Sequence, residues 1–266
     1  MTINPTFLKI LEYKRLEVER LKSVFPLETL RKAAVKQGAK RSLRAALTDS
    51  GEDIRIIAEI KRSSPSACFK PVEFDPEGIA KSYESAGAVA LSVLTEARFF
   101  SGNSAYVPLI RYATSLPVLR KDFIVDIWQV VESAALGADA ILLMAVNFRD
   151  TEAIEPLYKE AIELGLAPLV EIHSEKEWRM VEPLKPAIVG INNRDFLSLD
   201  LKVDIGTTVA LAPLLPSGVA VVSESGISTR EDIERLKNCG VHGFLVGSSL
   251  MKADDPGKAL KKLIAG

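Results

Sequence analysis

The feature that most constrains the fold of this chain is a set of eight short apolar runs. The runs cover residues 54–60, 88–93, 117–120, 138–143, 167–170, 187–191, 219–222 and 243–246. Each is rich in Val, Ile, Leu and Ala and lacks polar alternation, which is typical of parallel strands that are buried on both faces. Ile54 and Gly243, the first residues of the first and last runs, lie 189 residues apart, so the seven steps average 27 residues each.

Amphipathic stretches with a helical pattern separate the runs. The candidates are residues 76–86, 126–136, 151–164, 175–181, 229–238 and 256–264. Gly87, Gly137, Gly165 and Gly240 stand where helices would end before the next strand. Eight strand–helix units in a chain of this length predict a (β/α)8 TIM barrel, whose usual size is about 250 residues. The alternative is a doubly wound open sheet, but no Gly-x-Gly-x-x-Gly fingerprint follows the first run.

The first fifty residues have a purely helical pattern. Asn4-Pro5 provides an N-cap and a proline at the first helical position. An apolar stripe follows at helical spacing and consists of Phe7, Ile10, Leu11, Val18 and Leu21. Two further helical stretches are expected at 27–37 and 42–47. Because no linker is evident, we expect residues 1–266 to form one barrel domain, with residues 1–50 as a helical extension that packs on it and helps to cover its mouth.

Composition and charge exclude several functional classes. The chain has 34 basic and 35 acidic residues, so no positive excess indicates a nucleic-acid or membrane-surface partner. Its cysteines, Cys68 and Cys239, and its histidines, His173 and His242, lack metal-ligand spacing, so no metal site is expected. No signal peptide or apolar run of about 20 residues is evident, which favours a cytoplasmic protein. The expected partner is a small molecule. The oligomeric state is open, with a monomer favoured.

Charged and amide side chains end several of the apolar runs. The active site of a barrel lies at the carboxyl ends of its strands. Glu59 and Lys61 are two residues apart and therefore point to the same side of a strand, although a structural ion pair explains them equally well. Lys121, Glu171 and Asn192 end three other runs. Convergence of these side chains in one mouth favours a site, whereas a lone histidine such as His173 is given no catalytic role.

Glycine and serine residues follow the last two runs, as Ser225-Gly226 and Gly247-Ser248-Ser249. Barrels often bind phosphate at this place, where glycines let backbone N–H groups approach an anion. Either segment alone is equally consistent with an ordinary tight turn. Phe100 and Phe123 follow the second and third runs, where aromatic rings line a pocket for a flat ligand or cap the barrel core.

Seven segments in order resemble the indole-3-glycerol phosphate synthase family. They are residues 58–66 (AEIKRSSPS), 91–96 (LSVLTE), 119–124 (LRKDFI), 170–173 (VEIH), 190–195 (GINNRD), 223–227 (SESGI) and 246–251 (VGSSLM). The N-terminal helices also resemble that family's extension, which packs over the mouth. The resemblance implies a phosphorylated small-molecule substrate, 1-(2-carboxyphenylamino)-1-deoxyribulose 5-phosphate. It also implies the products indole-3-glycerol phosphate, carbon dioxide and water, with no cofactor.

The resemblance also implies roles for individual residues. Lys121 is expected to be a general acid, Glu171 and Glu59 acid–base or electrostatic carboxylates, and Lys61 a carboxylate-binding lysine. Asn192 and Ser225 complete the expected catalytic set. The expected substrate-binding residues are Ser64, Phe100, Phe123, Arg194, Glu224, Gly226, Gly247 and Ser248. The chain departs from the family at Ala67-Cys68 and at Asn103, which affects loop conformation but no expected catalytic position.

Two mechanistic questions stay open at this point. Dehydration needs an acid and a base, and spacing does not choose between Lys61 with Glu59 and Lys121 with Glu171. We also expect Lys61 and Lys121 to lower each other's pKa, because neighbouring positive charges disfavour the ammonium form. A sugar-phosphate isomerase and a non-catalytic phosphosugar-binding barrel are the alternative functions.

Overall fold

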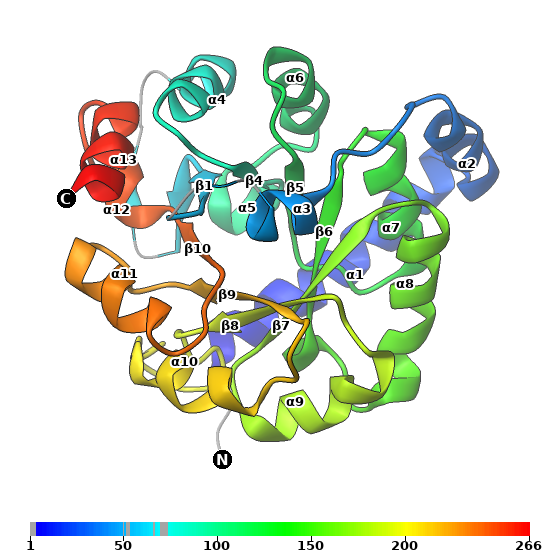
Figure 1. The fold of residues 1–266 in the computed structure, drawn as a ribbon. Helices are drawn as coiled ribbons and strands as arrows, with labels where there is room; N and C mark the ends of the chain where they lie inside the picture. Colours follow the sequence, from blue (N-terminus) through cyan, green and yellow to red (C-terminus); the bar gives the residue numbers. More distant parts are fainter. Residues whose placement is uncertain (1–3, 50, 52–53, 66, 70–73) are drawn as a thin grey trace.

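Eight parallel strands close into a barrel in the order β1-β10-β9-β8-β7-β6-β5-β4 and back to β1 (Figure 1). The computed structural model describes residues 4–49, 51, 54–65, 67–69 and 74–266. The strands are β1 (Ile56–Ile60), β4 (Ala90–Leu94), β5 (Val118–Lys121), β6 (Ala140–Met144), β7 (Ala167–Ile172), β8 (Ile188–Asn192), β9 (Ala220–Glu224) and β10 (Gly243–Val246). This arrangement confirms the predicted (β/α)8 barrel.

Every predicted run coincides with one barrel strand, but six of the eight strands, β4 to β9, extend further at their carboxyl ends than the predicted runs do. β5 ends at Lys121, β8 at Asn192 and β9 at Glu224. The ladder continues through these polar residues, with Asn192 paired to Glu224 across β8 and β9. An inward-pointing charge that finds a partner inside the barrel does not interrupt strand pairing. The polar residues therefore stand on rigid strands rather than in loops.

Helices surround the barrel, and all six stretches predicted between the runs are helical. The outer helices are α4 (Pro76–Ser85), α6 (Tyr106–Ala113), α7 (Ile127–Ala135), α8 (Thr151–Glu163), α9 (Glu175–Val181), α10 (Gly206–Leu211), α11 (Arg230–Lys237) and α13 (Pro256–Ala265). Of these, α6 and α10 were not predicted. Pro108 stands in the first turn of α6, where the amide that it lacks has no intrahelical partner. No helix in the described ranges combines the length and apolar character that a membrane span requires.

Short elements occupy the connections. They are the hairpin strands β2 (Ser63–Ser64) and β3 (Ala67–Cys68), the helices α5 (Ala97–Phe100) and α12 (Ser248–Met251), and the 3-10 turns η1 (Ala145–Asn147), η2 (Glu182–Leu184) and η3 (Ala212–Leu214). The β2–β3 hairpin, α5 and α12 follow β1, β4 and β10 directly. They therefore lie at the carboxyl ends of the barrel strands.

Alternation along the strands produces two apolar clusters. On β1, Ala58 and Ile60 pack in the layer between the sheet and the helices, whereas Ile57 belongs to the interior cluster. Glu59 is two residues from Ile57 and so points into the barrel as well. The barrel interior is thus apolar towards the amino ends of the strands and charged at the mouth, where the strands end.

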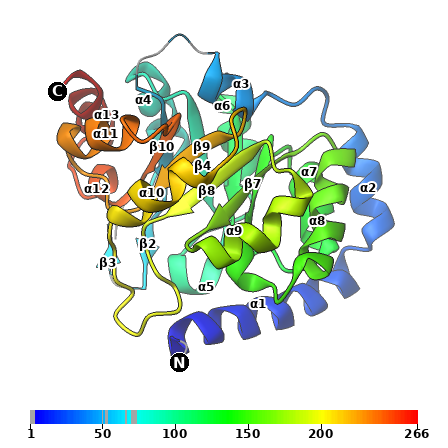
Figure 2. The ribbon, with the colours of Figure 1, turned by 60° about the horizontal axis from the view of Figure 1, so that its bottom comes forward.

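The N-terminal extension divides between the two ends of the barrel. Helix α1 (Pro5–Val24) crosses the carboxyl end, and α3 (Leu43–Thr48) lies at the opposite end (Figure 2). Helix α2 (Leu27–Val35) packs beside α7. Of the extension that was expected to help cover the mouth, α1 therefore lies there, whereas α2 and α3 do not. Leu43 and Leu47 of α3 are fully buried in the interior cluster, where they close the bottom of the barrel.

Leu47→Ala is expected to lower the free energy of unfolding by about 2–5 kcal/mol, because it opens a cavity among buried side chains. Leu47 fits against Gly243, the first residue of β10, where an added Cβ would lie 2.4 Å from Leu47 Cδ2. Leu16→Ala is the matched control, since Leu16 on α1 is 63% exposed and its removal should cost less than about 0.5 kcal/mol. Urea denaturation of both variants measures this difference, and equal stabilities would contradict the role of α3 as the barrel floor.

Candidate active site

A cluster of buried carboxylates and half-buried lysines occupies the mouth of the barrel, and Lys121 lies at its centre. Lys121 Nζ is 2.8 Å from Glu224 Oε2 on β9 and 3.4 Å from Glu59 Oε2 on β1. The other oxygen of Glu59 is 2.6 Å from Lys61 Nζ. Strands far apart in sequence thus contribute side chains to one chain of ion pairs, as the polar run ends predict.

Glu171 and Asn192 form a second part of the cluster. Asn192 Nδ2 donates a hydrogen bond of 3.0 Å to Glu171 Oε2, and both residues are buried. Asn192 is itself fixed, because its Oδ1 accepts from the backbone N–H of Arg194 and its carbonyl oxygen accepts from Nδ1 of His173. His173 therefore holds the backbone that carries Asn192.

The charges in the cluster shift the pKa values of its members in opposite directions. Burial opposes ionisation of Glu59, but the ammonium groups of Lys61 and Lys121 outweigh it and lower the pKa of Glu59 to about 2. Burial and the nearby charge of Glu224 raise the pKa of Glu171 well above its ordinary value of 4.5. Two carboxyl groups in one mouth therefore have very different basicities.

The pKa of Lys121 moves opposite to the expected direction. Burial alone would lower it, but the surrounding carboxylates, with Glu224 and Glu59 contributing most, raise the pKa of Lys121 above its ordinary value of 10.5. The expectation that Lys61 lowers the pKa of Lys121 is therefore wrong. Run ends indicate which charges converge, but which charge lies nearest depends on distances that a sequence does not contain.

Two glycines provide the space in which the carboxylates lie. An added Cβ at Gly190 on β8 would lie 2.2 Å from Glu224 Oε1, and one at Gly247 would lie 2.3 Å from Glu59 Oε1. Neither distance is tolerable for real atoms, so a side chain at either position must displace a carboxylate. Gly247 was predicted from its place after the last run, whereas the requirement at Gly190 became visible only in the structure.

Gly247→Ala is expected to lower kcat by about 10- to 100-fold, because it moves Glu59 away from both lysines and small displacements in a site have effects of this size. Binding of inorganic phosphate should change less, because alanine keeps the backbone N–H and readily adopts the φ of −135° found at this position. Gly226→Ala is the contrasting variant, since Gly226 has φ +79° and belongs to the predicted phosphate turn. It should weaken phosphate binding instead. Steady-state kinetics and phosphate calorimetry separate the two effects, and an unchanged kcat in Gly247→Ala would refute the spacing argument.

The turn after β9 has an unusual backbone that Asn193 supports. Ser225 and Gly226 adopt left-handed φ values of 69° and 79° in succession. Asn193 Nδ2 donates to the carbonyl oxygen of Ser225 at 2.9 Å, and its Oδ1 accepts from Thr208. This role of Asn193, which is fully buried, was not predicted. Turns are among the backbone conformations whose successive N–H groups form anion-binding concavities.

Other expected substrate-binding residues lie around the same mouth. Ser248 Oγ accepts a hydrogen bond of 2.9 Å from Lys61 Nζ, which connects the last strand to the charged cluster. Arg194 is half-buried, and its guanidinium donates to the carbonyl oxygen of Leu201 at 3.2 Å. Ser64 lies on β2, and its neighbour Ser63 donates to Ser101 Oγ after α5 at 2.9 Å. The predicted departure at Ala67-Cys68 lies on β3 of the same hairpin.

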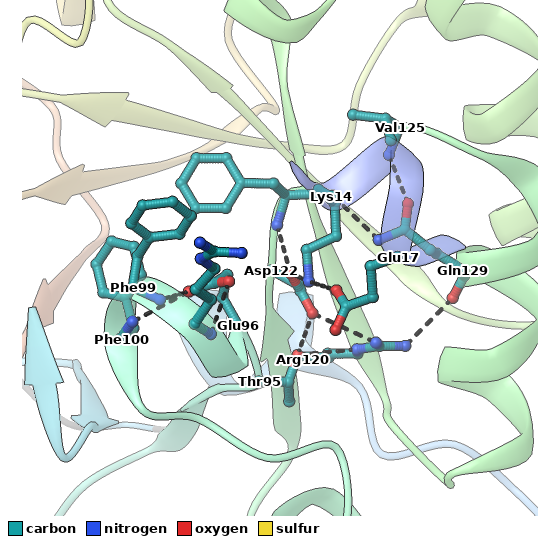
Figure 3. Close-up of polar contacts among 12 residues, drawn as sticks. Lys14, Glu17, Thr95, Glu96, Phe99, Phe100, Arg120, Asp122, Val125 and Gln129 are labelled. Atoms are coloured by element: carbon teal, nitrogen blue, oxygen red, sulfur yellow. Dashed lines mark hydrogen bonds and ion pairs between the residues drawn. The ribbon is translucent and has the colours of Figure 1, made fainter. Parts of the chain in front are cut away.

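Aromatic rings form one side of the mouth. The ring centroids of Phe100 and Phe123 are 6.0 Å apart, and Phe7 of α1 lies 6.3 Å from Phe123. Glu96 fixes the short helix that carries Phe100, because its carboxylate accepts from three backbone N–H groups, including that of Phe100 at 3.0 Å (Figure 3). The contribution of Phe7 was not predicted, since its place in an apolar stripe indicated only packing.

The chain closely resembles known proteins along almost its whole length. The sequence model of the indole-3-glycerol phosphate synthase family matches residues 7–263. A protein of that name from Alkaliphilus metalliredigens is 42% identical over 258 residues, which is 97% of each chain. Another of that name from Geobacillus kaustophilus is 43% identical and covers 96% of this chain and 95% of its own. The chain belongs to the indole-3-glycerol phosphate synthase family.

Solved structures outside the family show how widely this barrel is shared. A thiamine phosphate pyrophosphorylase from Pyrococcus furiosus superposes with a TM-score of 0.58 at 19% identity, covering 84% of this chain and 96% of its own. A 3-hexulose-6-phosphate synthase superposes with a TM-score of 0.62 at 16% identity, covering 80% and 99%. At such low identity the likeness shows the fold alone, and assignment to the indole-3-glycerol phosphate synthase family depends on the sequence.

A metal centre does not emerge from the described residues, where no three His, Cys, Asp or Glu side chains are placed to hold an ion. Cys239 and His242 lie in the connection between α11 and β10, which leads to the amino end of the last strand. The positively charged side chains described at the mouth are those of Lys61, Lys121 and Arg194.

Proposed function

We propose that this chain converts 1-(2-carboxyphenylamino)-1-deoxyribulose 5-phosphate to indole-3-glycerol phosphate, with loss of carbon dioxide and water, in tryptophan biosynthesis. Membership of the family supports the reaction. The observation that carries the site assignment is the contact of the half-buried Lys121 with the buried carboxylates of Glu224 and Glu59 at the barrel mouth. A half-buried ammonium among carboxylates provides both a proton and fixed charge where ring closure develops opposite charges.

In ring closure, the ring carbon that bears the carboxylate attacks the ribulose ketone. The ketone oxygen becomes an alkoxide, and we assign its protonation to Lys121. The raised pKa of Lys121 keeps it charged throughout the neutral range. Transfer remains favourable, because an alkoxide is about as basic as hydroxide.

Attack also leaves a positive charge on the ring as an iminium. We assign stabilisation of that charge to the ionised carboxylates at the mouth, Glu59 in particular, whose pKa of about 2 keeps it charged. Carbon dioxide then leaves, and the electron pair of the broken bond restores the aromatic ring. Lys61 is the lysine that we assign to the substrate carboxylate before that step.

In dehydration, the new hydroxyl group leaves with a proton while a base removes the proton from the adjacent carbon. We assign the base to Glu171. A base whose pKa is about 2 accepts protons poorly, which disfavours Glu59, whereas the raised pKa of Glu171 makes it the stronger base. Asn192 holds the carboxylate of Glu171 by the hydrogen bond to Oε2 and so orients it.

Phosphate binding is assigned to the turns after β9 and β10, with Gly226, Gly247 and Ser248 providing backbone N–H groups. The successive left-handed residues at Ser225 and Gly226 support this assignment. Anchoring the phosphate far from the reacting carbons orients the flexible chain and converts remote binding energy into rate. The aromatic pair Phe100 and Phe123 is assigned to the carboxyphenyl ring.

All of these side chains belong to one chain, so we propose that a monomer is competent. A biosynthetic role with a phosphorylated intermediate also favours a cytoplasmic location. The test is to supply the purified protein with the carboxyphenylamino-deoxyribulose phosphate and to follow indole fluorescence. Appearance of indole-3-glycerol phosphate supports the proposal. A barrel that interconverts the ribulose and ribose forms, or only binds them, gives no indole and would refute it.

A further inference from the structure

The buried stripe of α1 contains a lysine where helical spacing calls for an apolar side chain. Lys14 lies between Leu11 and Val18 on the face that packs against the barrel, and it is 3% exposed. A buried ammonium is costly unless it is paired. Lys14 is paired twice, with Glu17 Oε2 at 2.6 Å and with Asp122 Oδ1 at 2.9 Å (Figure 3).

Asp122 is the centre of a fully buried polar network outside the barrel wall. Its Oδ2 accepts from Thr95 Oγ1 at 2.6 Å and pairs with Arg120 at 3.4 Å. Arg120 also pairs with Glu132 of α7 at 2.7 Å. Figure 3 shows Lys14, Thr95 and Arg120 converging on Asp122, with Gln129 of α7 beside Arg120. The network therefore joins the extension to the strand that carries Lys121.

Asp122 also fixes the backbone at its two neighbours, Lys121 at the end of β5 and Phe123 after it. The same oxygen that meets Lys14, Oδ1, accepts from the backbone N–H of Phe123 at 2.8 Å. The carbonyl oxygen of Lys121 accepts from the backbone N–H of Thr95, whose hydroxyl group donates to Asp122. Strand alternation then points Lys121 inward while Asp122 points outward. A shift of the Asp122 carboxylate is thus transmitted to Lys121 and Phe123.

We propose that Lys14 is a positioning residue for the reaction, which holds Asp122 and thereby sets the pose of Lys121 and Phe123. This inference depends on the function proposed above. It gives α1 a specific electrostatic part beyond covering the mouth. Lys14 forms ion pairs with Glu17 and Asp122, and it is Asp122 that continues to the backbone of Phe123.

A cavity beside the Lys14–Asp122 ion pair allows an added ammonium compound to replace the lysine side chain in a test. It has a volume of about 240 Å³ and is lined by Lys14, Asp122, Arg120 and Gln129, among others. In Lys14→Ala the missing stem and ammonium enlarge this cavity. We expect kcat to fall roughly 10- to 100-fold with KM nearly unchanged, as for a sub-ångström misplacement of a catalytic group. Added propylammonium, which matches the deleted atoms, should recover part of kcat, whereas propanol should not.

The matched control is Lys22→Met. Lys22 also joins α1 to the region of α7, by an ion pair of 2.7 Å with Asp126, but it is one-third exposed. Exposed pairs of this kind contribute little, so kcat should stay near the wild-type value. A kcat of Lys14→Ala equal to that of the control, or equal recovery by propanol, would overturn the inference.

Hydrogen exchange provides a readout that needs no turnover. The Phe123 amide should exchange faster in Lys14→Ala than in Lys22→Met, because its acceptor Asp122 loses its partner. Unchanged protection of the Phe123 amide would overturn the inference, whether or not the wild-type protein forms indole. Failure of the wild-type protein to form indole would refute the proposed function and is a separate result. Asp122→Asn keeps the shape of the side chain but removes the charge that pairs with Lys14. It therefore tests the contact between Lys14 and Asp122 if Lys14→Ala does not fold, and the same fall in kcat is expected.

Discussion

Replacement of Lys121 by methionine is expected to lower kcat by about 100- to 10,000-fold, which is the usual contribution of a general acid. Methionine keeps much of the volume of the stem but removes the proton and the positive charge between Glu224 and Glu59. Since the alkoxide develops only as the ring closes, the loss should appear mainly in kcat, with substrate still bound through its phosphate and ring. Steady-state kinetics with the purified variant measures it.

Lys121→Arg is the companion variant. It keeps the charge, but its planar guanidinium fork does not place a donor where the compact ammonium of Lys121 lies, so it should restore little activity. Circular dichroism and urea denaturation must first show that both variants fold, because two carboxylates lose their partner. A folded Lys121→Met protein with near wild-type kcat would remove Lys121 as the ring-closure acid and leave Lys61 as the candidate.

Glu171→Gln is expected to lower kcat by a similar factor of about 100- to 10,000-fold, because the amide cannot accept the proton that dehydration releases. Glutamine keeps the side chain's shape and an oxygen for the hydrogen bond from Asn192 Nδ2. If ring closure still proceeds, the hydroxylated intermediate should accumulate before indole appears. Rapid-quench analysis detects it, and accumulation in Glu59→Gln instead would transfer the role of base to Glu59.

The pH dependence of the wild-type protein follows from the same assignment. The folded protein disfavours the charged form of Glu171, whose pKa lies well above 4.5. A base works only when ionised, so kcat should fall as the pH decreases through this raised pKa, at a higher pH than for an ordinary glutamate. Glu59, with a pKa of about 2, should remain ionised throughout that range. A profile that stays flat down to pH 5 would contradict the assignment of Glu171.

The sequence predicted the barrel well because each buried parallel strand must be apolar on both faces. That signal is local, and it places one strand in each of the eight runs. It fails at the strand ends, where Lys121, Asn192 and Glu224 continue the ladder as inward-pointing polar residues. These residues break the apolar pattern because they form the site.

Other features escaped prediction because they depend on contacts between distant segments. The sequence around Leu43 and Leu47 predicts only a short helix. The closed barrel shows that both side chains fill its interior at the end opposite the mouth. Gly190 reads as a strand glycine until Glu224 is placed beside it. Lys14 was a local signal that the sequence did contain. A charged residue within the apolar stripe predicts a buried ion pair, because a charge at a buried helical position requires a partner.

The most direct test of the site is a crystal structure of the Lys121→Met variant with the carboxyphenylamino-deoxyribulose phosphate bound. Our account predicts the phosphate at the N–H groups of Gly226 and Ser248, and the aromatic ring beside Phe100 and Phe123. It places the ribulose ketone oxygen next to residue 121 and the reacting carbons within reach of Glu171. A substrate bound with its phosphate elsewhere, or with the ketone facing away from residue 121, would contradict it.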